Sequence, residues 1–198
     1  MQFAKPILFL ILALLVISCN NQQEPAVTEE TAPEVEEVVV EEPKDLFSKL
    51  STYCGKPFAG KLLHSYAGPD FYKEKPMTIN FEYCNEKEIS IPFSVGEDRS
   101  KTWKLLKTEE GFSLKHQEVD GEGKPKKITM YGGDATANPE NPFSLAFPAD
   151  EETVKMISVA KENVWMLDLN PATQILTYTI KRGDEIRFSA AFDLTTSK

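Results

Sequence analysis

Hydrophobic and polar residues alternate along much of the chain after residue 43. Apolar residues occupy every second position at 77–83, 89–95 and 186–194, and the positions between them are mostly polar. This period of two is typical of an antiparallel strand with one face in a core and the other in solvent. The same pattern, bounded by turn residues, predicts further strands at 57–65, 101–108, 112–119, 126–131, 162–169 and 174–181.

Two short helices are predicted to interrupt the strands. Leu46, Phe47 and Leu50 have the spacing of a short amphipathic helix. Residues 147–160 predict a second helix, in which the carboxylate of Asp150 caps the first turn.

Many short strands joined by short turns indicate a mainly β fold. We expect an antiparallel meander of about eight or nine strands that closes, or nearly closes, into a β-barrel with one or two short peripheral helices, because closure removes exposed sheet edges. A β-sandwich is the alternative. Gly132 and Gly133 allow positive φ, so a tight strand exit is expected there. A barrel of this size is either filled by side chains or holds one small ligand.

The first 18 residues have the pattern of an export signal. Lys5 supplies the positive charge, Ile7 to Ile17 form the apolar run, and Ser18 is the small residue before the cleavage site. The apolar run is shorter than the roughly 20 residues that span a bilayer. An ordinary secretory signal or a short anchor helix is the alternative interpretation.

The end of this run resembles the lipobox of bacterial lipoproteins, in the sequence Val16-Ile17-Ser18-Cys19. The resemblance implies cleavage after residues 1–18, a diacylglyceryl group on the Cys19 thiol and acylation of the new amino terminus. It also implies that the protein is anchored by lipid to a membrane of the bacterial cell envelope, on its periplasmic or outer side. Asn20 after the cysteine favours the outer membrane.

Residues 19–43 are predicted to form the lipidated cysteine and a disordered acidic tether. The stretch 20–42 contains eight Glu and no Lys or Arg, and such a segment buries too little apolar surface to fold; a strand at 35–42 is the alternative. The tether carries most of the net charge of −9, because 21 basic and 23 acidic side chains remain from Pro43 onwards. The single folded domain at 44–198 is therefore nearly neutral, without the basic surface that nucleic-acid binding needs.

The chain has three cysteines. With Cys19 lipidated, Cys54 and Cys84 remain, and the oxidising envelope favours a disulfide between them. Closing a loop of about 30 residues would stabilise the fold by roughly 3–4 kcal/mol on the chain-entropy model. Two reduced core thiols or a metal-binding pair are the alternatives.

Histidines are the first candidates for a site. His64 and His116 are both predicted to point inward near strand ends, with Glu118 or Asp120 as a partner of His116. Structural core or rim histidines are the alternative. A metal site needs further ligands, and the sequence has neither a G-x-S-x-G elbow nor C-x-x-C. No catalytic residue, metal or cofactor is therefore predicted.

A second group of candidates lies in and beside a polar hairpin loop. Arg99 is placed to bind an anion, with Asp98 and Ser100 beside it and Trp103 opening the next strand. The alternative is structural: Asp98 and Ser100 build the turn. Trp165 is a possible stacking surface and fits a core or rim position better.

Several blocks together resemble a family of uncharacterised secreted bacterial proteins. The resemblance covers most of Cys54 to Asp193 and rests on C-G-x-x-F-x-G, I-P-F-S-V-G-E-D-R-S-K-T-W, L-K-H, Y-G-G-D, F-P-A-D and N-x-W. It implies candidate positions at Asp98, Arg99, Ser100, His116 and Tyr131, but no reaction. The family's K-H-D-H-like strand reads Lys115-His116-Gln117-Glu118 here, so its second histidine is missing.

The sequence favours a non-enzymatic, lipid-anchored β-barrel that binds a small molecule, a lipid or another envelope protein. Anchor, tether and barrel pattern are present, whereas catalytic groupings are sparse. Two alternatives stay open. One is an envelope hydrolase that uses His116 with acidic partners, and the other is a purely structural envelope protein.

Overall fold

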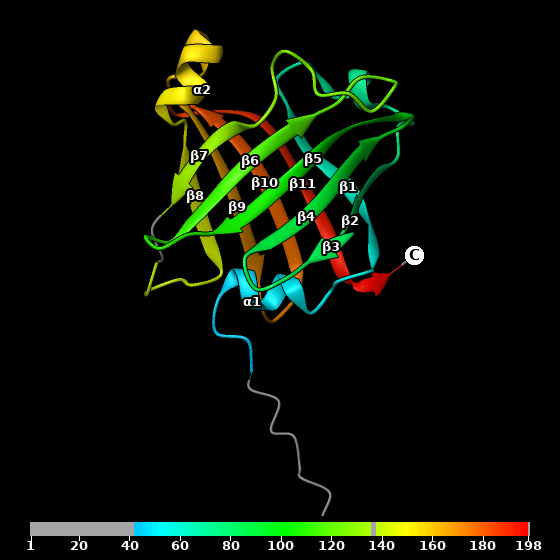
Figure 1. Ribbon diagram of the computed structural model, residues 1–198. Helices are drawn as coiled ribbons and strands as arrows, with labels where there is room; N and C mark the ends of the chain where they lie inside the picture. Colours follow the sequence, from blue (N-terminus) through cyan, green and yellow to red (C-terminus); the bar gives the residue numbers. More distant parts are fainter. Residues whose placement is uncertain (1–41, 136–137, 198) are drawn as a thin grey trace, which may run out of the picture. The chain divides into compact units, whose positions relative to one another are not determined.

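The computed structural model describes residues 42–135 and 138–197 (Figure 1). These residues belong to one compact unit. The predicted signal peptide at 1–18, Cys19 and nearly all of the tether at 19–43 lie outside the described residues. Among the described helices, none has the length and apolar character to cross a membrane.

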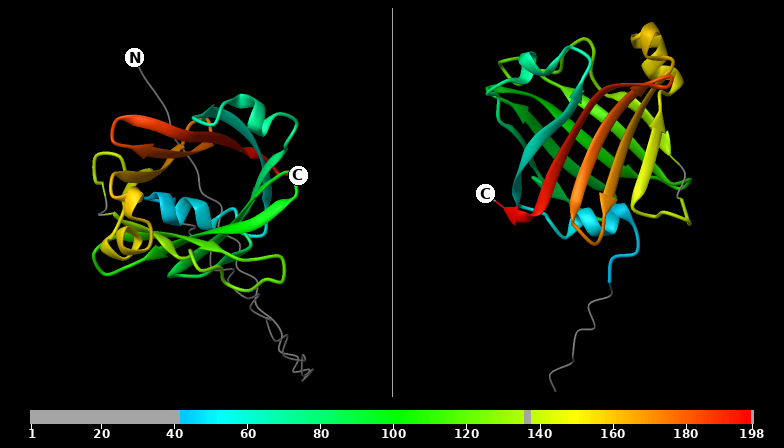
Figure 2. Two further views of the ribbon diagram at one scale, coloured as in Figure 1. Left: turned by 90° about the horizontal axis from the view of Figure 1, so that it is seen from above. Right: turned by 180° about the vertical axis from the view of Figure 1, so that it is seen from behind.

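The unit is built on one antiparallel sheet that curls into a nearly closed barrel (Figure 2). Its strands are β1 Pro57–Ser65, β2 Met77–Asn80, β3 Tyr83–Cys84, β4 Glu88–Val95, β5 Asp98–Lys107, β6 Phe112–Glu118, β7 Tyr131–Ala135, β8 Ser144–Pro148, β9 Asn163–Asn170, β10 Ile175–Arg182 and β11 Glu185–Ser197. The order around the sheet is β7-β6-β5-β4-β2-β1-β11-β10-β9-β8, and β3 pairs with β4. The predicted barrel is confirmed, and the alternative of two packed sheets is excluded.

The strand count differs from the prediction, since the described residues form eleven strands instead of eight or nine. The expected strand at 77–83 is split at Phe81, whose backbone pairs with Gly55 and Lys56 instead. The segment 126–131 is mostly loop, and β7 begins where that strand was expected to end. The short strand β8 precedes the second helix and was not predicted.

The inner face of the sheet carries most of the apolar side chains that the alternation selects. The buried core includes Ile79, Ile91, Phe93, Phe188 and Phe192. The pattern fails at two strand ends, where Tyr83 and Ile186 are exposed. A side chain at the end of a strand has fewer neighbouring residues to cover it. The alternation of apolar and polar residues therefore predicts burial less well at strand ends.

Helix α1, Leu46–Ser51, lies across one end of the barrel (Figures 1 and 2). Leu46, Phe47 and Leu50 are buried, as their spacing predicts. Asp45 caps the helix by accepting a hydrogen bond from the backbone N–H of Ser48 at 2.7 Å. The helix therefore closes this end with apolar side chains.

A disulfide joins the turn after α1 to the edge strand β3. Cys54 and Cys84 are bonded, with their Cα atoms 6.0 Å apart, which confirms the predicted pair. The disulfide fixes the closing helix to the wall of the barrel.

A seam remains where β7 and β8 meet. One bridge pairs Gly133 with Ala149, and the backbone N–H of Asp150 donates to the Gly132 carbonyl at 3.0 Å. Helix α2, Glu151–Met156, follows at once and is capped by Asp150, as predicted. Its buried Thr153 hydroxyl accepts from the Gly132 N–H at 2.7 Å and donates to the Gly132 carbonyl at 2.9 Å.

The two glycines at the seam have a role different from the one predicted. Neither Gly132 nor Gly133 has a positive φ. A Cβ on Gly133 would overlap the Pro148 carbonyl, and one on Gly132 would overlap the Leu114 carbonyl. Glycine is needed here because backbones pack directly against each other on both sides of β7.

Two 3-10 helices complete the described residues. Helix η1, Pro69–Tyr72, follows β1 at the end of the barrel opposite α1, and η2, Ser158–Ala160, follows α2. Helix η1 was not predicted. The helix predicted at 147–160 is shorter than expected, because 147–148 belong to β8 and η2 is separated from α2 at Ile157. The aromatic side chains of η1, Phe71 and Tyr72, border the barrel's open end.

Candidate functional site

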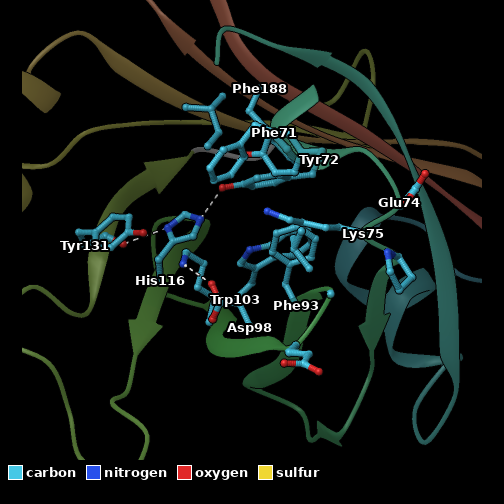
Figure 3. Close-up of a pocket in the computed structure, with 17 residues that line it drawn as sticks. Phe71, Tyr72, Glu74, Lys75, Phe93, Asp98, Trp103, His116, Tyr131 and Phe188 are labelled. Carbon is cyan, nitrogen blue, oxygen red and sulfur yellow. Dashed lines mark hydrogen bonds and ion pairs between the residues drawn. The ribbon is translucent and has the colours of Figure 1, made fainter. Parts of the chain in front are cut away.

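The end of the barrel opposite α1 contains a cavity of about 860 Å³ (Figure 3). Helix η1 and the turn between β4 and β5 form its rim, and inward-facing residues of the barrel strands form its wall. It is lined by Phe71, Tyr72, Glu74, Lys75, Pro76, Phe93, Val95, Gly96, Glu97, Asp98, Lys101, Trp103, His116, Tyr131, Tyr178, Ile180 and Phe188. Most of this lining is aromatic or aliphatic.

Three of the predicted candidates form one row across the sheet. Trp103 on β5 pairs with His116 on β6, and His116 pairs with Tyr131 on β7. The imidazole stacks on the Tyr131 ring with centroids 4.9 Å apart and planes inclined by 10°. Cross-strand pairing places these side chains together although they are far apart in the sequence.

Tyr178 on β10 joins this row to the opposite wall. Its ring stacks on Trp103 with centroids 4.2 Å apart, and Trp103 stacks in turn on Phe93 at 4.9 Å. The result is a continuous aromatic surface along one side of the cavity. Tyr178 was not singled out from the sequence, although its alternation with Leu176 and Ile180 was a usable signal that it faces inward.

Both nitrogens of His116 are engaged in hydrogen bonds. Nδ1 lies 3.1 Å from the Tyr131 carbonyl oxygen, which can only accept, so Nδ1 carries the proton. Nε2 then accepts a hydrogen bond from the Tyr178 hydroxyl at 2.7 Å. Only 2% of His116 is exposed, and burial lowers its pKa to about 4. His116 is therefore a neutral group that holds the Tyr178 hydroxyl in place.

A polar chain continues behind the row. The hydroxyl of Tyr131 donates to Glu118 at 2.9 Å, and burial raises the pKa of Tyr131. Lys126 and Lys101 flank Glu118, at 3.2 and 3.9 Å from its oxygens. Glu118 is thus linked to His116 through Tyr131 and forms no direct bond with it. Asp120, the other predicted partner, accepts from the backbone of its own turn.

Asp98, Arg99 and Ser100 lie at the start of β5, and the turn before it consists of Gly96 and Glu97 alone. The prediction that these three residues form the hairpin loop and that Trp103 opens the strand is therefore wrong, whereas Asp98 and Ser100 do make the local contact of the structural alternative. Asp98 accepts from the backbone N–H of Ser100 at 3.0 Å, and hydrogen bonds from Ser100 lower its pKa to about 2. Asp98 borders the cavity, whereas Ser100 does not. Arg99 is exposed and does not line the cavity, so the structure does not place it to bind a ligand there.

Two remaining candidates lie outside the cavity lining. Trp165 on β9 is buried behind the row, with its ring centroid 5.2 Å from that of His116. His64 is exposed, so the prediction that it points inward is wrong. The register of β1 shifts between Leu62 and His64, and such a bulge reverses which side of the sheet the following residues face.

The indole N–H of Trp103 is a polar group available to a ligand. It has no acceptor among the described residues. The only fully enclosed side-chain N or O atom without a partner in this part of the chain is Asn80 Oδ1. The indole nitrogen is therefore not sealed, and it borders the cavity, as Figure 3 shows.

A second depression, of about 1010 Å³, lies beside the disulfide. Its lining is mainly polar and includes Ser48, Asn85, Lys87 and Glu109. It lacks the convergent aromatic wall of the first cavity. In the described parts of the chain, no group of three or more His, Cys, Asp or Glu is placed to hold a metal ion.

The fold and the cavity define an antiparallel β-barrel that is closed by a helix at one end and has an aromatic cavity at the other. No family model, curated protein or solved structure matches the chain. Its function is therefore argued from the residues of the cavity.

Proposed function

We propose that the barrel binds one small, mainly apolar molecule in the cavity opposite α1. The observation that carries this proposal is the aromatic lining of a space of about 860 Å³. Ligand sites in proteins are typically concave, about 300–1,000 Å³ in volume, and lined by apolar and aromatic groups with few polar ones. Both the volume and the lining fit that description.

The polar groups of the cavity support binding better than hydrolysis. Nε2 of His116 already accepts a hydrogen bond from the Tyr178 hydroxyl, so it is not free to act as a base. Burial raises the pKa of Tyr178 well above its ordinary value, so its phenol is not an activated nucleophile. These groups are neutral and held in fixed positions. Together with the Trp103 N–H, they can orient a bound molecule.

Binding is testable with N-phenyl-1-naphthylamine, a neutral aromatic dye that fluoresces more strongly in apolar surroundings. We expect saturable, one-site binding to the full-length protein. Val95 lines the cavity, and Val95→Trp fills part of it. This variant should weaken dye binding at least about tenfold, because each 1.4 kcal/mol of lost contact is a factor of ten.

Val159→Trp is the matched control, since Val159 is 65% exposed and does not line the cavity. It should bind the dye like the unchanged protein. Absence of saturable binding by the unchanged protein would overturn the proposal, and so would equal affinity in the two variants.

We also propose that Cys19 anchors the protein to a bacterial envelope membrane. The support is the apolar run that ends in Val16-Ile17-Ser18-Cys19 and the acidic stretch after it. In a lipoprotein-processing bacterium, we expect the unchanged protein in the detergent-extracted membrane fraction and Cys19→Ala mainly outside it, because acyl chains contribute about 0.8 kcal/mol for each buried methylene. Mass spectrometry of the mature amino terminus then shows whether acyl groups are present. A Cys19 without lipid would contradict this proposal.

A further inference from the structure

Lys75 places a positive charge over the open end of the cavity. Its Nζ lies 4.3 Å from the centroid of the Phe71 ring, and its aliphatic stem passes next to Gly96. Figure 3 shows the ammonium group extending between the η1 aromatic rings and Trp103. The residue follows η1 in a loop, so no strand or helix periodicity in the sequence indicates this position.

The charge of Lys75 is not neutralised by a carboxylate of the described residues. Every ion pair of this part of the chain lies elsewhere. The carboxylate of the adjacent Glu74 points in another direction (Figure 3). The second cation of the lining, Lys101, differs because Asp98 and Glu118 lie 3.4 and 3.9 Å from its Nζ.

The aromatic wall behind Lys75 carries no charge. The other charged groups of the lining are Glu74 on the loop after η1, Glu97 in the turn between β4 and β5, and Asp98 and Lys101 at the start of β5. Phe93, Trp103 and Tyr178 stack along this wall. Burial keeps His116 neutral, and both of its ring nitrogens are in hydrogen bonds. A ligand charge placed deep among these groups would lose hydration without gaining a partner. A charge at the rim beside Lys75 would keep part of its hydration and gain an ammonium group.

We propose, resting on the binding function above, that the ligand is an amphiphile with an anionic head group. Lys75 binds the carboxylate or phosphate, and the apolar body lies against Phe93, Trp103 and Tyr178. A cationic head group is disfavoured because it would meet the Lys75 ammonium at the rim. The anion partner inferred here is thus Lys75 in place of Arg99, which the sequence suggested.

The test compares four ligands with the same twelve-carbon chain and different head groups. Dodecanoate, dodecyl phosphate, dodecanol and dodecyltrimethylammonium each compete with N-phenyl-1-naphthylamine for the full-length protein, below their critical micelle concentrations. We expect at least one anion to bind about tenfold more tightly than dodecanol, as a charge-assisted hydrogen bond at the rim would give. The ratio of dodecanoate to dodecyl phosphate distinguishes a carboxylate lipid from a phosphate lipid.

Lys75→Gln removes the charge while keeping most of the side-chain length. It should weaken the preferred anion about tenfold and leave dodecanol within about twofold. Lys73→Gln is the matched control, because Lys73 is exposed on the same loop and does not line the cavity. Lys73→Gln should retain the preference for the anion.

The outcomes separate this proposal from the one on which it rests. If the dye and dodecanol bind and are blocked by Val95→Trp, but Lys75→Gln leaves anion affinity unchanged, the anionic head group is wrong and the cavity still binds. Tighter binding of dodecyltrimethylammonium than of either anion would overturn the head-group assignment in the same way. If neither the dye nor any of the four ligands binds, the binding function itself fails.

Discussion

Gly133→Ala is expected to lower the free energy of unfolding by more than about 4 kcal/mol. The added Cβ would overlap the carbonyl oxygen of Pro148, which is backbone and cannot move aside as a flexible side chain can. Overpacking that side chains can absorb costs about 1–3 kcal/mol, and larger losses mark a specific structural conflict. To accommodate the methyl group, β7 and β8 must separate at the seam that completes the barrel.

Chemical unfolding followed by circular dichroism measures this effect. Gly121→Ala is the control, because Gly121 has no positive φ and an added Cβ meets nothing within 4 Å; its stability should stay within about 0.5 kcal/mol of the unchanged protein. Thr153→Val is a milder test of the same seam, since it removes both hydrogen bonds to Gly132 and should cost about 1–3 kcal/mol. A Gly133→Ala protein as stable as the unchanged one would contradict the direct backbone contact.

Lowering the pH from 7.5 to 5 is expected to reduce the stability of the barrel by about 2 kcal/mol through His116 alone. In the unfolded chain His116 takes up a proton near its ordinary pKa of 6.5, whereas burial lowers its folded-state pKa to about 4. Between these values the unfolded state binds more protons, so stability falls as the pH falls. The loss reaches about 3 kcal/mol below pH 4.

Unfolding free energies at pH 7.5, 6 and 5 check this expectation. His116→Gln has no titrating imidazole at this position, so its stability should change much less over the same interval, although it starts lower because the two hydrogen bonds of His116 are altered. His64→Gln is the matched control, because His64 is exposed. Its unfolding free energy should depend on pH as that of the unchanged protein does. Asp98, Asp150 and Glu88, whose pKa values are lowered by hydrogen bonds, lose their contribution only at still lower pH. A flat profile for the unchanged protein would show that His116 is not sealed from water.

The same contacts connect stability with the proposed binding site. Protonating His116 would turn Nε2 into a hydrogen-bond donor. Nε2 could then no longer accept the hydrogen bond from the Tyr178 hydroxyl. Tyr178 stacks on Trp103, so the aromatic wall of the cavity would lose a hydrogen bond that holds one of its rings in position. In the folded protein this protonation occurs near pH 4, so ligand affinity should decline around pH 4 and stay nearly constant between pH 7.5 and 5.

Most strands could be predicted because alternation is a property of neighbouring residues. The predicted strand at 57–65 matches β1 in both bounds, and 162–169 and 174–181 each lie within one residue of β9 and β10. The alternation of apolar and polar residues gave wrong predictions where the pairing between neighbouring strands is irregular. The register shift before His64 turned that side chain outward, and the break at Phe81 divided one expected strand into β2 and β3.

The candidate site was predicted only in part. Trp103, His116 and Tyr131 were selected and do lie together, because each is on an inward face and cross-strand register aligns them. Tyr178 and Lys75 were missed, since nothing near them in the sequence shows that they meet the other three. Their positions depend on the closure of the sheet and on the path of the loop after η1.

By itself, the sequence determined a β-rich domain with short helices near 46–50 and after Asp150, an inward face for most strands, and a disulfide between Cys54 and Cys84. These features follow from the local order of apolar and polar residues and from the number of cysteines. Only the tertiary structure decided that β7 meets β8 through Gly133, and that the cavity gathers Lys75, Trp103 and Tyr178. Such contacts join residues far apart in the chain, and they depend on strand register, bulges and loop paths that the alternation of neighbours does not specify.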